Sequence, residues 1–364
     1  MSPSGTRLLP RDVPVQLLDE HGSLTKDADY PTPSMERMQQ AYASLINGRR
    51  INDQCNALVR QGRLAVYPSS NGQEACQVAA ALALSDGDWL FPTYRDSVSV
   101  ITRGVAPEDA MVLLRGDWHS GYDPHEFGVA PQATPLATQL LHAVGFAQAA
   151  AYRNEPTVVL AMCGDGATSE GDFHEAMNFA AVFKLPVVFF VQNNEFAISV
   201  PLARQTAAPS LAHKAIGYGM PGQRVDGNDV AALLSVLEEA VDRGRRGEGP
   251  TLVEAHTYRM LAHTNADDDT RYREREEVQA WADRDPLTRV RSYLRAEGLL
   301  DDKAEEAMAE TAEGIAAELR AAMNADPVLN PEELFAHVYA ERPATLDAQW
   351  ALLQDEIERT EARA

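Results

Sequence analysis

The sequence predicts an α/β protein whose doubly wound, mainly parallel β-sheet carries helices on both faces. Continuous apolar runs, each as long as a buried strand, occupy residues 157–162 and 186–191, and residues 251–255 have the pattern of a further strand. Amphipathic helical patterns lie between these runs, at 172–184 and 230–243. Strands of a parallel sheet are buried on both faces and alternate with helices, so this order of elements indicates such a sheet.

Length and composition agree with this fold and argue against two classes of partner. The chain has 364 residues, of which 45% are hydrophobic, and this is enough for a sizeable core. The 54 acidic residues outnumber the 32 basic ones, and the resulting net charge of −22 repels nucleic acids and anionic membranes. No apolar run approaches the roughly 18 residues of a membrane-spanning helix. We therefore expect neither a nucleic-acid nor a membrane partner.

The cysteines and the N-terminal residues indicate a reduced, cytoplasmic protein. The chain has three cysteines, Cys55, Cys76 and Cys163, and no two of them form a CxxC motif. Because their number is odd, they cannot all be paired in disulfides within the chain. The first residues, MSPSGTRLLPRDVP, lack the apolar stretch of a signal peptide. We expect the three cysteines to be small buried apolar residues.

The region before the first apolar run is expected to be mainly helical. Residues 1–34 hold five prolines and little periodicity, which predicts an arm that lies on the body or extends from it. Apolar residues three and four apart predict a long amphipathic helix over 35–58. Two shorter helices should follow, separated by a turn at 86–88. Residues 115–132 lack periodicity, and a loop of this length is typically functional.

The C-terminal part returns to helical patterns over 275–325. Residues 301–326 hold eight acidic residues against two basic ones, which is typical of a solvated helix face. We expect three parts in the chain: an N-terminal arm at 1–34, an α/β domain with helical additions at 35–340, and a C-terminal helical tail at 341–364.

Polar residues follow the first two apolar runs, which end in Gly164-Asp165-Gly166 and Gln192-Asn193-Asn194. The carboxyl ends of neighbouring parallel strands meet at one edge of the sheet, so Asp165 and Asn194 are expected to lie close together. Carboxylate and amide oxygens suit Mg²⁺, which is commonly shared with the phosphates of a bound ligand. No GxGxxG motif and no Walker lysine is present, which disfavours a nicotinamide dinucleotide or a P-loop nucleotide.

Residues 164–199, GDGATSEGDFHEAMNFAAVFKLPVVFFVQNNEFAIS, resemble the diphosphate-binding motif of thiamine-diphosphate enzymes. The match is specific to the alpha subunit of the decarboxylating, first component of 2-oxo acid dehydrogenase complexes. The segments AVYPSSNGQEA, LFPTYRDS, TPLATQLLHAVG and HTNADDDTRYR are similar to that family as well, so the resemblance extends from about Ala41 to Tyr339. It implies the diphosphate-binding half of a thiamine-diphosphate-binding fold.

The resemblance also implies a set of site residues. The Mg²⁺ ligands would be the side chains of Asp165 and Asn194 and the backbone carbonyl of Phe196. Catalytic roles are implied for His263 and for His119, which lies in DWHSGYDPHE. The residues implied in cofactor binding are Tyr94, Arg95, Thr134, Leu136, Asp165, Gly166, Ala167, Gln192, Asn194 and His263.

Some positions depart from the family pattern, and they bear on the roles that the resemblance implies. Gln192 stands where some relatives place a phosphate-binding arginine. Thr138 and Gln139 match K⁺ ligands of branched-chain relatives, but Ala133 stands where these have a serine, so a K⁺ site is left open.

The implied activity is oxidative decarboxylation of a branched-chain 2-oxo acid and transfer of the acyl group to a lipoyl group of the core acyltransferase. The family's glutamate at the aminopyrimidine ring belongs to a second domain, and this chain has one doubly wound unit. The chain is therefore expected to need a beta subunit, in a two-plus-two heterotetramer.

Two alternatives remain open at this stage. Pyruvate is the alternative substrate, because KLPVVFFVQNNEFAIS and the His119 segment are similar to pyruvate members. A non-catalytic structural subunit is a distant alternative, since such a subunit would have lost residues of the site, whereas Asp165, Asn194, Arg95 and His263 are all present.

Overall fold

A computed structural model of the full chain describes residues 8–117, 120–326 and 330–362. Contacts divide the chain into two compact units, Met1–Asn324 and Ala325–Ala364. The candidate residue His119 lies outside the described residues. Among the helices of the described segments, none is long and apolar enough to cross a membrane.

The larger unit is built on a five-stranded sheet in which all neighbouring strands are parallel, as the sequence predicted. In sheet order the strands are β1 (Trp89–Phe91), β2 (Val159–Gly164), β3 (Val187–Asn193), β7 (Thr251–His256) and β6 (Gly222–Asp226). The sequence did not predict β1, which has three residues, or β6, whose sequence GQRVD is largely polar. Gly164 is in register with Gln192, which brings the ends of β2 and β3 to the same edge.

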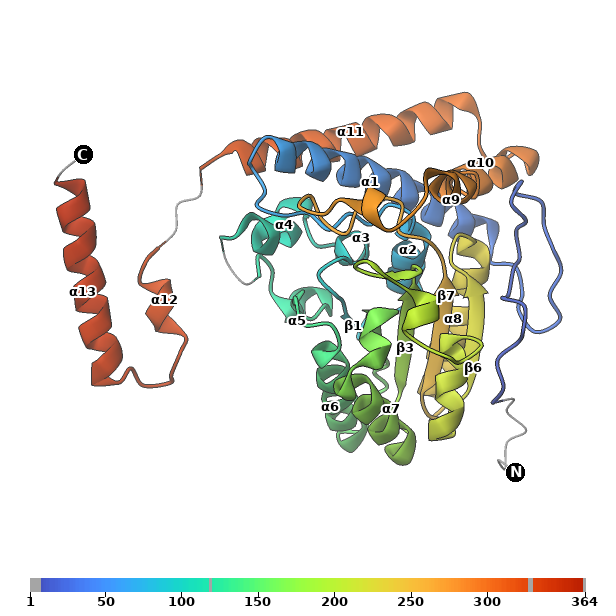
Figure 1. The fold of residues 1–364 in the computed structure, drawn as a ribbon, viewed down its shortest axis with the longest axis horizontal. Coiled ribbons are helices and arrows are strands. Elements are labelled where there is room, and N and C mark those ends of the chain that lie inside the picture. Colours follow the sequence, from blue (N-terminus) through green and yellow to red (C-terminus); the bar gives the residue numbers. More distant parts are fainter. Residues whose placement is uncertain (1–7, 118–119, 327–329, 363–364) are drawn as a thin grey trace. The chain divides into compact units, whose positions relative to one another are not determined.

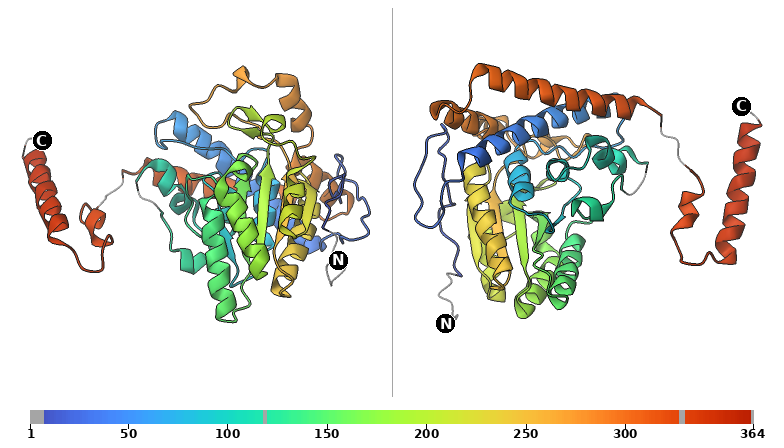
Figure 2. Two further views of the ribbon diagram at one scale, coloured as in Figure 1. Left: turned by 60° about the horizontal axis from the view of Figure 1, so that its bottom comes forward. Right: turned by 180° about the vertical axis from the view of Figure 1, so that it is seen from behind.

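Helices cover both faces of the sheet (Figures 1 and 2). Side chains of successive strand residues point to opposite faces, so each strand contributes to two cores. Leu160 and Met162 belong to one core, with α1 (Met35–Arg60), α2 (Glu74–Leu82) and α8 (Val230–Arg245). Ala161 and Cys163 belong to the other, with α6 (Thr138–Tyr152) and α7 (Gly171–Phe183). This confirms the doubly wound arrangement.

The remaining helices of this unit are short or lie outside the sheet layers. They are α3 (Ser97–Thr102), α4 (Pro107–Arg115), α5 (Pro124–Phe127), α9 (Arg275–Ala282), α10 (Pro286–Ala296) and α11 (Asp302–Asn324). The short α5 lies within the loop expected at 115–132. Ala312, Ala316, Leu319 and Met323 are the buried residues of α11, which packs on α1 and leaves most of its acidic side chains in solvent.

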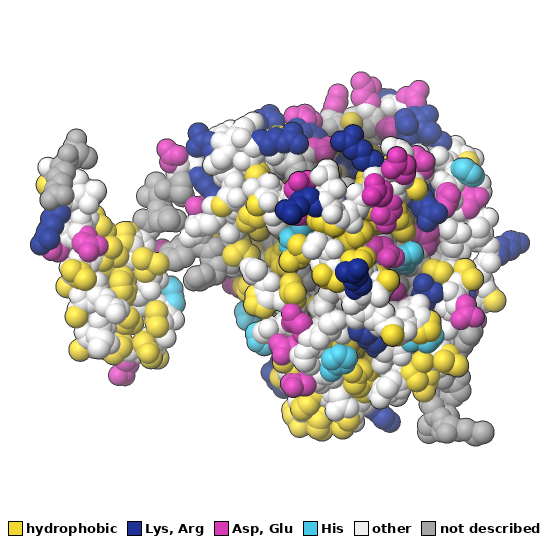
Figure 3. Space-filling view, viewed as in Figure 1, with side chains coloured by type: hydrophobic (Ala, Val, Ile, Leu, Met, Phe, Trp, Pro, Cys, Tyr) yellow, Lys and Arg dark blue, Asp and Glu magenta, His cyan; other side chains and the backbone are white. Residues whose placement is uncertain are grey.

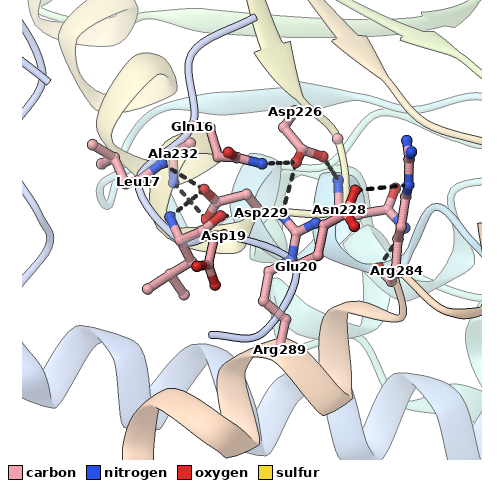
Figure 4. A network of polar contacts seen from close by, with 12 residues as sticks. Gln16, Leu17, Asp19, Glu20, Asp226, Asn228, Asp229, Ala232, Arg284 and Arg289 are labelled. Carbon is pink, nitrogen blue, oxygen red and sulfur yellow. Dashed lines mark hydrogen bonds and ion pairs between the residues drawn. The ribbon is translucent and has the colours of Figure 1, made fainter. Parts of the chain in front are cut away.

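The described part of the arm, residues 8–34, lies on the body of this unit. Val15 pairs in parallel with Val225, which extends the sheet beyond its edge strand β6. The backbone N–H groups of Leu17 and Leu18 donate to Asp229 Oδ2 over 2.6 and 2.7 Å, and the other oxygen of Asp229 caps α8 (Figure 4). One buried carboxylate thus joins the arm to a helix of the main core.

The smaller unit contains α12 (Glu333–Ala336) and α13 (Ala344–Glu361). Phe335 and Trp350 hold these helices together, with ring centroids 5.7 Å apart, and the guanidinium of Arg342 lies against both rings.

The larger unit contains three buried cysteines and an exposed apolar surface patch. Cys55, Cys76 and Cys163 are buried and free, as expected. Apolar side chains gather at the surface over α6 and α7 in Figure 3, and the exposed residues of these helices include Tyr152, Phe179, Val182 and Phe183. A patch of this kind is typical of an interface with another protein.

Candidate active site

A cavity of about 460 Å³ lies at the carboxyl edge of β2 and β3. It brings together every predicted cofactor-binding and metal-binding residue of the described chain. These residues are Tyr94, Arg95, Thr134, Leu136, Asp165, Gly166, Ala167, Gln192, Asn194, Phe196 and His263. The edge of a doubly wound sheet is where such folds bind ligands, because loops from successive strands turn away from each other there.

Asp165 and Asn194, the two candidate Mg²⁺ ligands with side-chain oxygens, follow β2 and β3 and are 1% and 6% exposed. Asp165 Oδ2 accepts a hydrogen bond from Gln205 Nε2 over 2.6 Å, and Asn194 Nδ2 donates to Gln73 Oε1 over 3.1 Å. Burial raises the pKa of Asp165, because its charge is removed from water. A cation at this carboxylate would offset that cost.

The donor set suits a metal that is shared with a ligand. In the described residues no cluster of three or more His, Cys, Asp or Glu side chains could hold a metal by itself. Asp165 therefore supplies one carboxylate, with an amide oxygen from Asn194 and a carbonyl from Phe196 as neighbours. Mg²⁺ bound by one or two protein oxygens typically completes its shell with phosphate oxygens and water, so a bound diphosphate fits this site.

Two buried guanidinium groups line the same cavity, those of Arg95 and Arg259, which are 6% and 1% exposed. Arg95 donates to the carbonyls of Ser69 and His263 over 3.0 and 3.1 Å, and Arg259 donates to the carbonyls of Phe196 and Ile198 over 3.2 and 2.7 Å. Across the part of the chain that the structure describes, neither forms an ion pair with a carboxylate. Buried charges are normally paired, so an anion bound at this end of the cavity would offset the cost of burying these two groups.

The second glycine of the GDG turn, Gly166, lies against a neighbouring side chain, whereas Gly164 has open space around it. A Cβ atom on Gly166 would lie 2.7 Å from Cβ of Ala197 across the cavity wall, which is too close for any other residue. Gln192 donates to Asp96 Oδ1 over 2.7 Å, and within the described chain its Oε1 atom is buried without a partner. Gln73 Nε2 is unpartnered in the same way. Both residues line the cavity, and their unpaired atoms are shielded from solvent.

The loop after β3 is strained around the third candidate metal ligand. Glu195 and Ile198 have φ angles of 73° and 55°, which residues other than glycine rarely adopt. They flank Phe196, whose carbonyl faces the guanidinium of Arg259. Strain of this kind persists where surrounding contacts impose it, and it is common at binding sites.

His263 is held as a neutral imidazole. Its Nδ1 atom lies 3.0 Å from Arg95 NH2, and because arginine only donates, the ring proton must be on Nε2. Burial and the nearby charges of Arg95 and Arg259 lower the pKa of His263 to about 4.

We expect the ligand to move this pKa. In the free protein His263 stays neutral down to about pH 4, so its contribution to stability falls as the pH drops from 6.5 toward 4, where the unfolded chain binds a proton that the folded chain does not. Addition of a diphosphate should raise the pKa, because the anion neutralises the guanidinium groups. An NMR titration of the ring resonance, assigned with His263→Gln, measures both values, and equal pKa values with and without the anion would contradict the placement of the anion beside His263.

Several polar residues at the site were not predicted, among them Gln73 and Arg259 on the cavity wall and Gln205, which contacts Asp165. Arg259 follows β7 in the segment GEGPTLVEAHTYR, where a basic residue directly after a buried strand was the available signal. Gln205 lies forty residues after Asp165 in an irregular segment, and no spacing rule pairs the two. The two candidate K⁺ ligands already form hydrogen bonds within the chain. Thr138 donates to Asp172 over 3.1 Å, and Gln139 donates to the carbonyls of Leu136 and Met162.

Fold and site together define a class of protein: an α/β protein with a ligand-sized cavity at the carboxyl edge of a doubly wound sheet, lined by buried guanidinium, carboxylate and amide groups. Residues 44–332 match the family model described as "Dehydrogenase E1 component". The chain is 48% identical over 360 residues to the 3-methyl-2-oxobutanoate dehydrogenase subunit alpha of Mycobacterium tuberculosis (strain CDC 1551 / Oshkosh), covering 99% of this chain and 98% of the relative. It is 37% identical over 343 residues to the pyruvate dehydrogenase E1 component subunit alpha of Staphylococcus aureus (strain Mu50 / ATCC 700699), covering 94% and 92%. The chain belongs to the dehydrogenase E1 component family.

Proposed function

We propose that this chain is the alpha subunit of a thiamine-diphosphate-dependent 2-oxo acid dehydrogenase that acts on 3-methyl-2-oxobutanoate and related branched-chain 2-oxo acids. The observation that carries the proposal is a pair of buried guanidinium groups, Arg95 and Arg259, without a carboxylate partner in the described chain, in one cavity with Asp165 and Asn194. An anion and a divalent cation bound together satisfy both halves of this cavity.

Different residues of the cavity bind the diphosphate and the metal. Arg95 and Arg259 hold the diphosphate, while Asp165, Asn194 and the carbonyl of Phe196 hold Mg²⁺. Thiamine diphosphate, when bound, supplies the nucleophilic carbon and the electron sink for decarboxylation. His263 keeps a proton on Nε2 and can donate it in a hydrogen bond to the bound anion or to substrate. Leu136, Val66 and Leu114 give the cavity wall an apolar part.

The active site is completed by a beta subunit, in a two-plus-two heterotetramer that delivers the acyl group to a lipoyl domain of the core acyltransferase. The described chain holds one doubly wound sheet, and the apolar patch over α6 and α7 supports a protein partner. The free, buried cysteines support a reducing, cytoplasmic location. A K⁺ ion at Thr138 and Gln139 is proposed because Gln139 Oε1 is buried and has no partner in the described residues.

Reconstitution tests this function. The chain alone should show no turnover, and the chain with its beta subunit, thiamine diphosphate and Mg²⁺ should decarboxylate 3-methyl-2-oxobutanoate. We expect kcat/KM for this acid to exceed that for pyruvate by about tenfold or more, because an apolar pocket discriminates by roughly that factor per methylene. Full activity without a partner would contradict the proposal that a beta subunit completes the active site. A preference for pyruvate would assign the chain to the alternative substrate.

A further inference from the structure

Gln205 contacts the carboxylate that we assign to Mg²⁺, and it does so from the segment that carries the third ligand. This residue follows the hairpin of β4 (Phe196–Ala197) and β5 (Val200–Pro201) and the turn Leu202–Arg204. Its Nε2 atom donates to Asp165 Oδ2 over 2.6 Å and to the carbonyl of Val200 over 2.9 Å. One amide group therefore joins the end of β2 to the loop after β3.

The orientation of this amide is fixed by its partners. Both of them, a carboxylate oxygen and a carbonyl oxygen, accept hydrogen bonds, and only the NH₂ group can serve them. A flipped amide would place Oε1 against two acceptors. Oε1 of Gln205 has no partner in the described chain, so the side chain gives up one hydrogen bond to keep Nε2 on Asp165.

We propose that Gln205 is a positioning residue for the metal: it holds one oxygen of Asp165 so that the other is presented to Mg²⁺ in the correct direction. This inference rests on the proposed function, because it assumes that Asp165 binds Mg²⁺. Gln205 acts through Asp165 and is not a ligand itself. Its neutral amide orients the carboxylate without adding charge to a site that must also accept a diphosphate, and partners of this kind set the geometry of metal ligands in proteins.

The test compares two metals that differ in their demand for geometry. Mg²⁺ requires a near-octahedral shell, whereas Ca²⁺ tolerates irregular ones. In the complex of the full chain with its beta subunit and saturating thiamine diphosphate, Gln205→Met should raise the Kd for Mg²⁺ by about 10–100-fold, the usual effect of losing such a partner. The Kd for Ca²⁺ should rise clearly less. Isothermal titration calorimetry measures both constants without any turnover.

Controls separate positioning from a loss of structure. Gln279, exposed on α9, also donates from Nε2 to a carboxylate, that of Asp283 over 3.2 Å, and Gln279→Met should leave both metal constants unchanged. Gln205→Asn retains an amide but is one methylene too short to reach Asp165, so it should repeat the effect if the Met variant folds poorly.

Three results would overturn the inference. The first is a Kd for Mg²⁺ in the Gln205 variants that lies within about twofold of the wild-type value. The second is an equal rise in the Kd for Mg²⁺ and the Kd for Ca²⁺, which would indicate general damage to the loop. The third is a wild-type complex that binds no Mg²⁺ with thiamine diphosphate, and only this result overturns the proposed function as well.

Discussion

Asp165→Asn should raise the Kd for thiamine diphosphate in the presence of Mg²⁺ by about 10²–10³-fold. Asp165 is the single carboxylate among the proposed metal ligands, and removing one partner of a buried charge pair costs about 3–5 kcal/mol. The asparagine side chain has the same shape, and its Oδ1 can still accept from Gln205, so the loss reports on charge rather than packing. Fluorescence or calorimetric titration of the complex measures the Kd, and turnover should fall with it.

The same substitution should act in the opposite direction on the protein without cofactor. A buried carboxylate with a raised pKa destabilises the empty site, because folding removes its charge from water. A neutral amide avoids this cost, so Asp165→Asn should unfold at an equal or higher urea concentration than wild type at pH 7. Asp242→Asn, at an exposed position of α8, is the matched control and should change neither quantity. An unchanged cofactor Kd in Asp165→Asn would remove the metal assignment.

Arg95→Met should weaken thiamine diphosphate binding by about 100-fold or more. Each charge-assisted hydrogen bond to a phosphate contributes roughly 1.5–3 kcal/mol, and a guanidinium group can form two of them in parallel. Arg95→Lys should recover part of the loss, since it restores the charge without the planar fork. Arg153→Met, which removes an exposed ion pair with Glu155, should leave the affinity unchanged.

His263 gives a second readout for the Arg95 prediction. The pKa of His263 is about 4 partly because Arg95 is charged and adjacent, so removing the guanidinium should raise this pKa toward its usual value. An NMR titration of Arg95→Met without cofactor measures the change. Wild-type cofactor affinity together with an unchanged pKa of His263 would show that Arg95 does not face the cavity in solution.

Much of the fold and the pair Asp165 and Asn194 follow from local sequence patterns, whereas most other residues of the candidate site came from the family resemblance. The strand patterns at 157–162, 186–191 and 251–255 correspond to β2, β3 and β7, because strands that are buried on both faces are rich in apolar residues. Asp165 and Asn194 could be placed together for a geometric reason: each follows a strand, and neighbouring parallel strands end at the same edge.

Local sequence patterns did not predict strand β6 or the site residues Arg259 and Gln205. β6 is polar because it lies at the edge of the sheet, where the arm pairs with it through Val15, and this position depends on chain more than two hundred residues away. Arg259 and Gln205 reach the site from a later strand and from an irregular loop. Their roles depend on distances between side chains that are remote in sequence.

The sequence by itself therefore determined the type of sheet, the residues at its carboxyl edge and the chemistry that those residues favour. Only the tertiary structure decided which further side chains surround them, how the amide of Gln205 is oriented, and that two arginines are buried without a carboxylate partner in the described chain. The reason is physical: periodicity and strand ends are set by each residue's own neighbours along the chain, whereas burial, pairing of charges and pKa are set by packing between distant segments.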